Sequence, residues 1–171
     1  MNIAIVYETK YGSTKEIAER IKVDLESNAI VVDLKKPTET ICWEQYDAFI
    51  LGSGIYAGKW LPKIEKLIKS RTEELSEKKV WFFSNGPTGD NPIEETIKEW
   101  KFPAYMASFL SAIKPQDVVV FKGKMELEKM NFLERFIITK MKAPVGDFRN
   151  WEEIESWTQK ITSTLQTGKN D

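Results

Sequence analysis

The sequence predicts an α/β protein built on a doubly wound, five-stranded parallel sheet, and two observations support this fold class. Five short, largely apolar and β-branched runs recur along the chain, as expected of strands buried on both faces. Amphipathic helical patterns separate these runs, and each connection is long enough to bring the next strand back in parallel. Because no repeat or compositional shift divides the 171 residues, we expect a single domain over residues 1–171.

The first strand is predicted at Asn2–Tyr7, a run of apolar and β-branched residues. Beyond a polar stretch that ends near Gly12, the residues Ile17, Ile21 and Leu25 recur four positions apart. This spacing places the three side chains on one face of a helix. The chain therefore begins with a strand, a polar loop and an amphipathic helix.

Two further strands are predicted at Ile30–Leu34 and Asp47–Gly52, which are again short apolar runs. A loop rich in glycine follows the second of them. A helix is then expected over Leu61–Leu75, where Ile64 and Ile68 share one face.

The remaining strands of the sheet are predicted at Val80–Ser84 and Asp117–Phe121. Between them, Ile93–Ala112 has a helical pattern that breaks near Pro103, since proline lacks the amide hydrogen that a helix interior needs. The chain ends in a helix predicted over Trp151–Leu165.

One segment, residues 122–150, does not fit this alternation and is predicted to be a helical insertion after the fifth strand. Within it, Met130, Leu133, Ile137 and Met141 fall at helical spacing. A connection of this length without secondary structure of its own would be unusual.

Composition excludes several chemistries. The chain has no histidine, which excludes histidine-ligated metals, a Ser-His-Asp triad and imidazole acid–base catalysis. Cys42 is the single cysteine, so an intramolecular disulfide is impossible and a reducing, cytoplasmic setting is expected. With 25 basic and 26 acidic residues, the net charge of −1 gives no basic field for nucleic acid. No apolar run approaches the length of a membrane span.

The loop after the first strand is the strongest indication of a ligand site. It leads from a strand into a helix, so its hydroxyls and backbone amides can converge on an anion at the helix N-terminus. Glycine allows the tight turn and a close approach of the ligand. In the alternative interpretation, Ser13 or Thr14 only caps the helix. The predicted phosphate-binding residues are Thr9, Lys10, Tyr11, Gly12, Ser13 and Thr14.

Two later loops leave the same edge of the sheet and suit a planar ring. Tyr56 stands between two glycines and offers an aromatic face, while Trp60 is either a second ring contact or part of the core. The loop after the fourth strand supplies amides, an amide side chain and a hydroxyl for the edge of a ring. The residues predicted to contact the ring are Ser53, Gly54, Ile55, Tyr56, Ala57, Gly58, Ser84, Asn85, Gly86, Pro87, Thr88, Gly89 and Asp90.

Two common nucleotide motifs do not fit these loops. The segment Gly54–Trp60 has three residues between its glycines where a P-loop has four, and Trp60 replaces the magnesium-binding hydroxyl. The glycines from Gly52 to Gly58 are one residue too widely spaced for a dinucleotide fingerprint and follow the third strand rather than the first. A phosphate loop with two ring-binding loops instead predicts FMN.

The phosphate loop, Thr9–Thr14, resembles that of flavodoxins, and this resemblance implies a flavodoxin-like sheet with strand order 2-1-3-4-5. The chain is most similar to one branch, the menaquinone-dependent protoporphyrinogen IX dehydrogenases and their flavodoxin-domain relatives. The similarity to this branch rests on Gln45–Asp47, Gly52–Ile55, Phe132–Ile137 and Gly146–Trp151. It implies that Thr9–Thr14 hold the FMN phosphate and that the other two loops face the isoalloxazine.

Two functions remain open at this point. One is an FMN-dependent oxidoreductase that oxidises a hydrophobic or porphyrinogen-like substrate and passes electrons to a quinone. The other is an electron-transfer flavodoxin that serves redox protein partners, although a net charge of −1 is far from the strongly acidic surface expected of such carriers. A flavin carries its own redox chemistry, so no catalytic side chain is assigned.

The insertion concentrates positive charge, with six basic and three acidic residues between Lys122 and Lys142. Three roles are considered for it. In the favoured one, Leu133, Phe136 and Ile137 pack over the edge of the sheet. The others are contact of residues 122–142 with an anionic membrane surface, at the inner face of the membrane, and a wall beside the flavin that receives a hydrophobic substrate.

Overall fold

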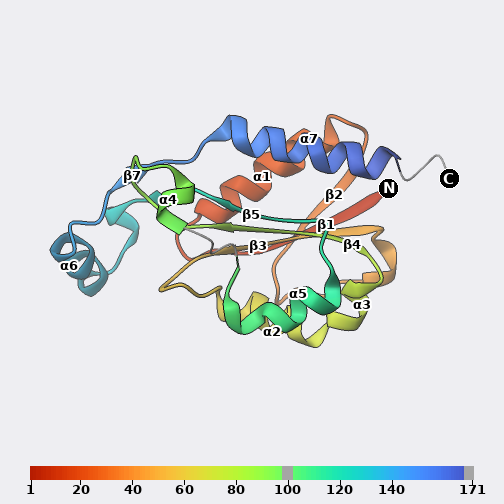
Figure 1. The fold of residues 1–171 in the computed structure, drawn as a ribbon, viewed down its shortest axis with the longest axis horizontal. Helices are drawn as coiled ribbons and strands as arrows, with labels where there is room; N and C mark the ends of the chain where they lie inside the picture. Colours follow the sequence, from red (N-terminus) through yellow and green to blue (C-terminus); the bar gives the residue numbers. More distant parts are fainter. Residues whose placement is uncertain (98–101, 168–171) are drawn as a thin grey trace.

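The computed structural model describes residues 1–97 and 102–167. A five-stranded sheet with the order β2-β1-β3-β4-β5 lies between two layers of helices (Figure 1). All four neighbouring pairs of strands are parallel, which confirms the predicted fold class and strand order. The strands of this sheet are β1 (Asn2–Glu8), β2 (Val31–Lys35), β3 (Ala48–Gly54), β4 (Lys79–Asn85) and β5 (Asp117–Phe121).

Helices α1 and α7 cover one face of the sheet, and helices α2, α3 and α5 cover the other (Figure 1). Three 3-10 turns, Trp43–Gln45, Ala104–Met106 and Leu127–Lys129, lie in the connections. The helices are α1 (Ser13–Glu26), α2 (Pro62–Ser70), α3 (Thr72–Ser76), α4 (Ile93–Ile97), α5 (Ala107–Ile113), α6 (Phe132–Lys140) and α7 (Trp151–Thr167).

Both faces of the central strands are buried, which explains why the strands are apolar throughout. In β1, Ile3 and Ile5 point into the layer formed with α1 and α7, whereas Ala4 and Val6 point into the opposite layer. All four side chains are fully buried. This alternation is the expected consequence of the two-residue period of a strand in a sheet covered by helices on both sides.

Two predicted helices differ in the structure. The predicted helix Leu61–Leu75 is two helices, because Arg71 leaves the helical region with φ −127° and ψ 23° between α2 and α3. The predicted helix Ile93–Ala112 is represented by α4 and α5, and the break near Pro103 is confirmed by the 3-10 turn that follows it. Part of this predicted helix, residues 98–101, lies outside the described residues.

The insertion contains the predicted helix, α6, and also a short sheet that was not predicted. Strands β6 (Lys124–Met125) and β7 (Gly146–Asp147) pair in antiparallel fashion and close the base of the insertion. Two-residue strands carry too little periodicity to be recognised in a sequence. As a result, α6 extends from the carboxyl ends of the large sheet to one end of the molecule (Figure 1).

The order of the strands determines where a ligand can bind. From β1 the chain first moves outward to β2 and then returns to the other side of β1 as β3. In such sheets the carboxyl ends beside this reversal form a crevice for ligands. The loops after β1, β3 and β4 all leave at this edge.

Candidate functional site

The loop between β1 and α1 presents an open helix N-terminus. Gly12 is the N-cap of α1, with φ 98°, a conformation that favours glycine. No side chain caps this helix, so the alternative in which Ser13 or Thr14 is the cap is wrong. The amide of Gly12 itself donates to Thr9 Oγ1 at 3.0 Å. The amides of the first turn after Gly12 therefore remain available to an anion.

A buried hydrogen-bond chain joins this loop to the end of β4. Thr14 Oγ1 donates to Asn85 Oδ1 at 2.8 Å, and Asn85 Nδ2 donates to Ser13 Oγ at 2.8 Å. Thr14 is 1% exposed and Asn85 is 3% exposed. The Thr14 hydroxyl hydrogen is thus used in its bond to Asn85. Ser13 Oγ only accepts a hydrogen bond from Asn85, so the hydrogen of the Ser13 hydroxyl remains available to donate to a ligand.

The loop after β3 is a tight hairpin turn. Tyr56 and Lys59 exchange two backbone hydrogen bonds, at 2.9 and 3.0 Å. The two residues between them, Ala57 and Gly58, have φ values of 50° and 73°, as in a type I′ turn. A positive φ is strained at alanine, and such strain is typical of ligand-binding loops. The turn holds the Tyr56 ring against the phosphate loop, where it meets Tyr11 edge to face at 5.9 Å between ring centroids.

The loop after β4 packs closely against its neighbours through backbone. The Ile55 amide donates to the Asn85 carbonyl at 2.8 Å, which joins the second loop to the third. A Cβ on Gly86 would lie 3.0 Å from Ile55 Cβ, and one on Gly123 would lie 2.9 Å from Gly86 Cα. Side chains larger than hydrogen would separate these segments, so glycine is needed for the close approach.

A cavity of about 470 Å³ lies between the three loops and the insertion, within the range typical of small-molecule sites. Glycine backbone and the Tyr56 ring form one side, and the insertion forms the other. The lining residues are Lys10, Tyr11, Ser13, Gly54, Ile55, Tyr56, Ala57, Asn85, Gly86, Lys124, Met125, Met130, Glu134, Ile137 and Ile138.

Lys10 connects the phosphate loop to helix α6. Its ammonium pairs with Glu134 and lies 5.0 Å from the centroid of the Tyr11 ring and 5.7 Å from that of Tyr56. The hydrogen bond from Lys10 lowers the pKa of Glu134 to about 2. Burial raises the pKa of Tyr56 to about 12 and also raises the pKa of Tyr11. Both phenols are therefore protonated at neutral pH.

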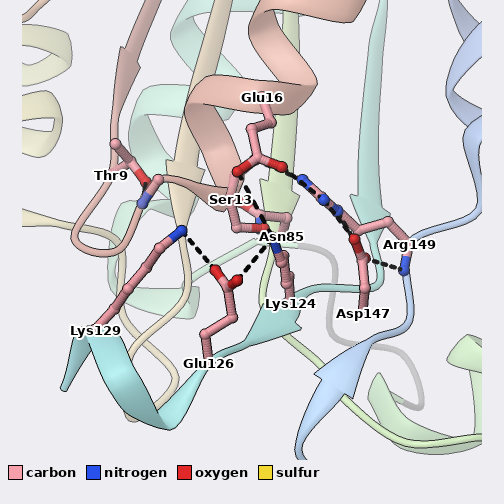
Figure 2. A network of polar contacts seen from close by, with 10 residues as sticks. Thr9, Ser13, Glu16, Asn85, Lys124, Glu126, Lys129, Asp147 and Arg149 are labelled. Carbon is pink, nitrogen blue, oxygen red and sulfur yellow. Dashed lines mark hydrogen bonds and ion pairs between the residues drawn. The ribbon is translucent and has the colours of Figure 1, made fainter.

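A second network of charges surrounds the start of α1 (Figure 2). Lys129 pairs with Glu126 at 2.5 Å, and its Nζ lies 3.9 Å from the position that a Cβ on Gly12 would take. Lys124 also pairs with Glu126, at 3.0 Å. The insertion thus brings two lysines close to the phosphate loop.

The third cation of this network, Arg149, is almost fully buried. Its guanidinium contacts Asp147 through two nitrogens, at 2.8 and 2.6 Å, and Glu16 at 2.7 Å. Burial opposes its charge, but the hydrogen bonds to these two carboxylates raise the pKa of Arg149 and lower that of Asp147. Arg149 also reaches the Ser13 carbonyl at 3.5 Å (Figure 2), so it fixes the end of the insertion to the phosphate loop.

The structure brings nine of the predicted site residues to the cavity, and they come from all three loops: Lys10, Tyr11, Ser13, Gly54, Ile55, Tyr56, Ala57, Asn85 and Gly86. Ser53 and Ser84 are fully buried, and their hydroxyls accept hydrogen bonds from the Leu61 amide and the Trp60 indole. Trp60 is 2% exposed and belongs to the core. Thr9, Gly12, Thr14, Gly58 and Pro87 are sequence neighbours of lining residues but do not themselves line the cavity. Thr88, Gly89 and Asp90 lie farther along the third loop, where Lys122 Nζ donates to the carbonyls of Gly89 and Asp90 at 3.1 and 3.4 Å.

The favoured role for the insertion is wrong. Leu133, Phe136 and Ile137 do not pack over the edge of the sheet, because their exposed fractions are 65%, 58% and 46%. Instead, Met130, Ile137 and Ile138 line the cavity. Of the three roles considered for the insertion, only a wall beside the flavin includes such a contribution. Across residues 1–97 and 102–167, the structure has no helix of the length and apolarity that a transmembrane segment requires.

Comparisons with known proteins agree with this architecture. The protein family described as "Flavodoxin domain" matches residues 4–150. The chain is 24% identical over 174 residues to protoporphyrinogen IX dehydrogenase (quinone) of Escherichia coli strain K12, with 94% of each chain covered. Its fold is similar to that of a flavodoxin from the domain Archaea, with a TM-score of 0.63, 16% identity and coverage of 97% of this chain and 99% of the other. A Streptococcus pneumoniae flavodoxin gives a TM-score of 0.60 at 12% identity, with 96% and 99% covered.

Proposed function

The chain belongs to the flavodoxin domain family, and on this premise we propose that it is an oxidoreductase that oxidises a hydrophobic, porphyrinogen-like substrate and passes the electrons to a quinone. Its cofactor is FMN, as membership of the family implies. Bound FMN supplies the electron-transfer chemistry, and the protein supplies binding, orientation and exclusion of water. Similarity to protoporphyrinogen IX dehydrogenase over nearly the whole chain supports the class of substrate.

For the phosphate, we assign the loop Thr9–Thr14. The uncapped amides at the start of α1 and the Ser13 hydroxyl are the donors that a phosphate would meet first. Lys129 Nζ lies 3.9 Å from the position that a Cβ on Gly12 would take, with Glu16 Oε1 at 4.0 Å from the same point, and contributes a positive charge from the insertion. Arg149 would act by holding the Ser13 backbone in place rather than by contact with the phosphate, since Asp147 and Glu16 occupy its guanidinium.

For the isoalloxazine, we assign the loops Ser53–Gly58 and Ser84–Asp90. Gly54 and Gly86 expose backbone to the cavity, so a planar ring can approach main-chain amides and carbonyls there. Tyr56 offers its ring for an offset or edge contact, which is worth about 0.5–1.5 kcal/mol. Its protonated phenol adds a hydrogen-bond donor at neutral pH.

The observation that carries the enzyme proposal is the apolar wall that the insertion adds to the cavity. Met130, Ile137 and Ile138 face the same space as the predicted ring-binding loops. A protein that only exchanges electrons with protein partners needs an exposed flavin edge, and such a wall would cover it. A site for a large hydrophobic molecule, by contrast, needs apolar surface and protection from water.

A steady-state assay with protoporphyrinogen and a menaquinone analogue tests the proposal. Each cycle removes two electrons and two protons from the substrate and delivers them to the quinone, which leaves as the quinol. Since a porphyrinogen loses six electrons and six protons to become the porphyrin, three cycles and three quinones are consumed for each porphyrin formed. We expect many turnovers per protein molecule, with porphyrin formation that requires both substrates. An electron-transfer flavodoxin, the alternative, would give at most stoichiometric reduction of the bound flavin. That result would overturn the enzyme proposal but leave FMN binding intact.

A further inference from the structure

Helix α6 exposes an unusual concentration of large apolar side chains. Phe132 is 87% exposed, more than any other large apolar side chain of the described residues, and α6 contributes no buried residue. Outside residues 132–145, exposed apolar side chains of this size in the described chain are only Val23, Val31 and Tyr105, which lie on separate elements. We call the exposed group the α6 patch: Phe132, Leu133, Phe136, Ile137, Met141 and Val145.

The position of the α6 patch favours contact with a broad surface. Helix α6 lies at one end of the molecule, beyond the carboxyl ends of the strands and away from the helices that cover the sheet (Figure 1). A patch on a projecting element can reach a flat partner without interference from the rest of the fold. Contiguous exposed apolar surface of this kind marks interaction sites rather than ordinary solvent-facing surface.

The charges around the α6 patch favour an anionic lipid surface over a second copy of the chain as its partner. Arg135, Lys140 and Lys142 lie within the same segment, and its one acidic residue, Glu134, is paired with Lys10. The Lys140 ammonium lies 6.0 Å from the centroid of the Phe136 ring, so cation and apolar surface are adjacent. A second copy docked face to face would bring these basic groups together, which is unfavourable. An anionic lipid surface accepts both the apolar side chains and the cations.

We propose that the α6 patch docks the protein on the surface of an anionic lipid bilayer, with its apolar side chains in the interface and its lysines among the headgroups. The proposal rests on the proposed function in one respect. Ile137 and Ile138 of the same helix line the cavity, so docking would bring the flavin site to the membrane in which a lipophilic quinone is dissolved.

Flotation of the FMN-loaded chain with lipid vesicles tests this docking. The probes are phosphatidylcholine vesicles with and without phosphatidylglycerol, at low and high salt. We expect the wild type to float with the anionic vesicles and to be released as salt rises. For the double variant F132S/F136S, the fraction of protein bound to vesicles should fall by about tenfold or more, because two large apolar side chains no longer enter the interface. K140Q/K142Q should lose the preference for anionic lipid.

The matched control is V23S/V31S, which also removes two exposed apolar side chains but from α1 and β2. It should float like the wild type. The FMN dissociation constant, followed by flavin fluorescence, should be unchanged in all three double variants and shows that each is folded. Failure of the wild type itself to bind FMN would instead contradict the cofactor site.

Three results would overturn the membrane proposal. They are absence of wild-type flotation at low salt, equal flotation of F132S/F136S and the wild type, and a wild-type dimer in sedimentation that this variant abolishes without any lipid binding. The last result would identify a second copy of the chain as the partner of the α6 patch.

Discussion

The two walls of the cavity are built in different ways. On the side of the phosphate loop, a buried hydrogen bond joins Thr14 of α1 to Asn85 at the end of β4. On the other side, α6 buries no residue and is joined to the loop by the exposed Lys10–Glu134 pair. The first wall is preorganised by the core of the fold, whereas the second is attached to it by surface contacts. Substitutions in the two walls should therefore affect different properties.

The largest effect is expected from Asn85→Ala, which attacks the preorganised wall. The variant removes both hydrogen bonds of the Asn85 side chain and leaves the Thr14 hydroxyl without its partner at a position that is 1% exposed. Loss of these bonds and an unsatisfied buried hydroxyl should together lower the free energy of unfolding by about 2–4 kcal/mol. Urea denaturation measures the change.

Asn28→Ala provides the control for this prediction. Asn28 also donates a side-chain hydrogen bond, to the Asp24 carbonyl at 2.9 Å, but it is exposed. Its removal should change the free energy of unfolding by no more than about 0.5 kcal/mol. Equal effects of the two variants on the free energy of unfolding would contradict the view that burial makes the hydrogen bonds of Asn85 stabilising.

A difference between neighbouring hydroxyls sharpens the comparison next. Ser13→Ala should weaken FMN binding by about 1.5–3 kcal/mol, the cost of one hydrogen bond to a charged group. It should lower stability less than Asn85→Ala does, because it removes only one of the two hydrogen bonds of the Asn85 side chain. Thr14→Ala should mainly lower stability, because its hydroxyl donates to Asn85 rather than to the cavity. Titration with FMN and urea denaturation of both variants separate the two effects. An unchanged FMN affinity in Ser13→Ala would mean that the phosphate binds elsewhere.

The contrast between the walls also explains what the sequence could predict. Strands buried on both faces leave continuous apolar runs, so the sheet and its five strands could be located, and the strand-to-helix loop with Gly12 could be recognised. The Thr14–Asn85 contact could not, because it joins residues 71 positions apart. The helical period in residues 130–141 predicted α6, but a period does not tell whether an apolar face meets the core, a ligand or solvent.

The charged part of the site shows the same limit. In the sequence, Lys124 and Lys129 are only members of a basic insertion, and Arg149 only belongs to a segment that resembles a family. Their position at the start of α1 depends on the β6–β7 pair, which folds the insertion back on itself. Such a short pairing has no sequence signature, so the cations could not be assigned to the phosphate loop before the structure was known.

A smaller effect is expected from the lysine that the insertion contributes. Lys129→Gln should weaken FMN binding about two- to fivefold, as expected for an exposed charge pair, and leave riboflavin binding unchanged. Glu126→Gln should strengthen FMN binding by a similar factor, since Lys129 loses its competing carboxylate. Fluorescence titrations with both flavins measure these changes, and Lys114→Gln, on a loop away from the site, serves as the control. Parallel changes for riboflavin would show that the phosphate is not the group recognised.

The smallest effect on global stability, with the sharpest pH dependence, is expected at the Lys10–Glu134 pair. Glu134 titrates at about 2 in the folded chain instead of at its usual 4.5, because Lys10 donates to its carboxylate. A lowered pKa stabilises the folded arrangement above the ordinary value and ceases to do so as the pH falls from about 4.5 toward 2. Hydrogen exchange in α6, corrected for the intrinsic rate, should therefore accelerate over this acid range. Loss of the pair should leave the urea midpoint measured near neutral pH unchanged.

Glu134→Gln tests the origin of this acid response. It should make exchange in α6 faster at neutral pH and nearly independent of pH in the acid range, because the residue no longer titrates. Glu19→Gln removes another exposed ion pair, with Lys15 on α1, and should leave the response of α6 intact. If α6 were instead held by its own packing, Glu134→Gln and Glu19→Gln would behave alike. The two walls would then differ in exposure but not in how firmly they are attached.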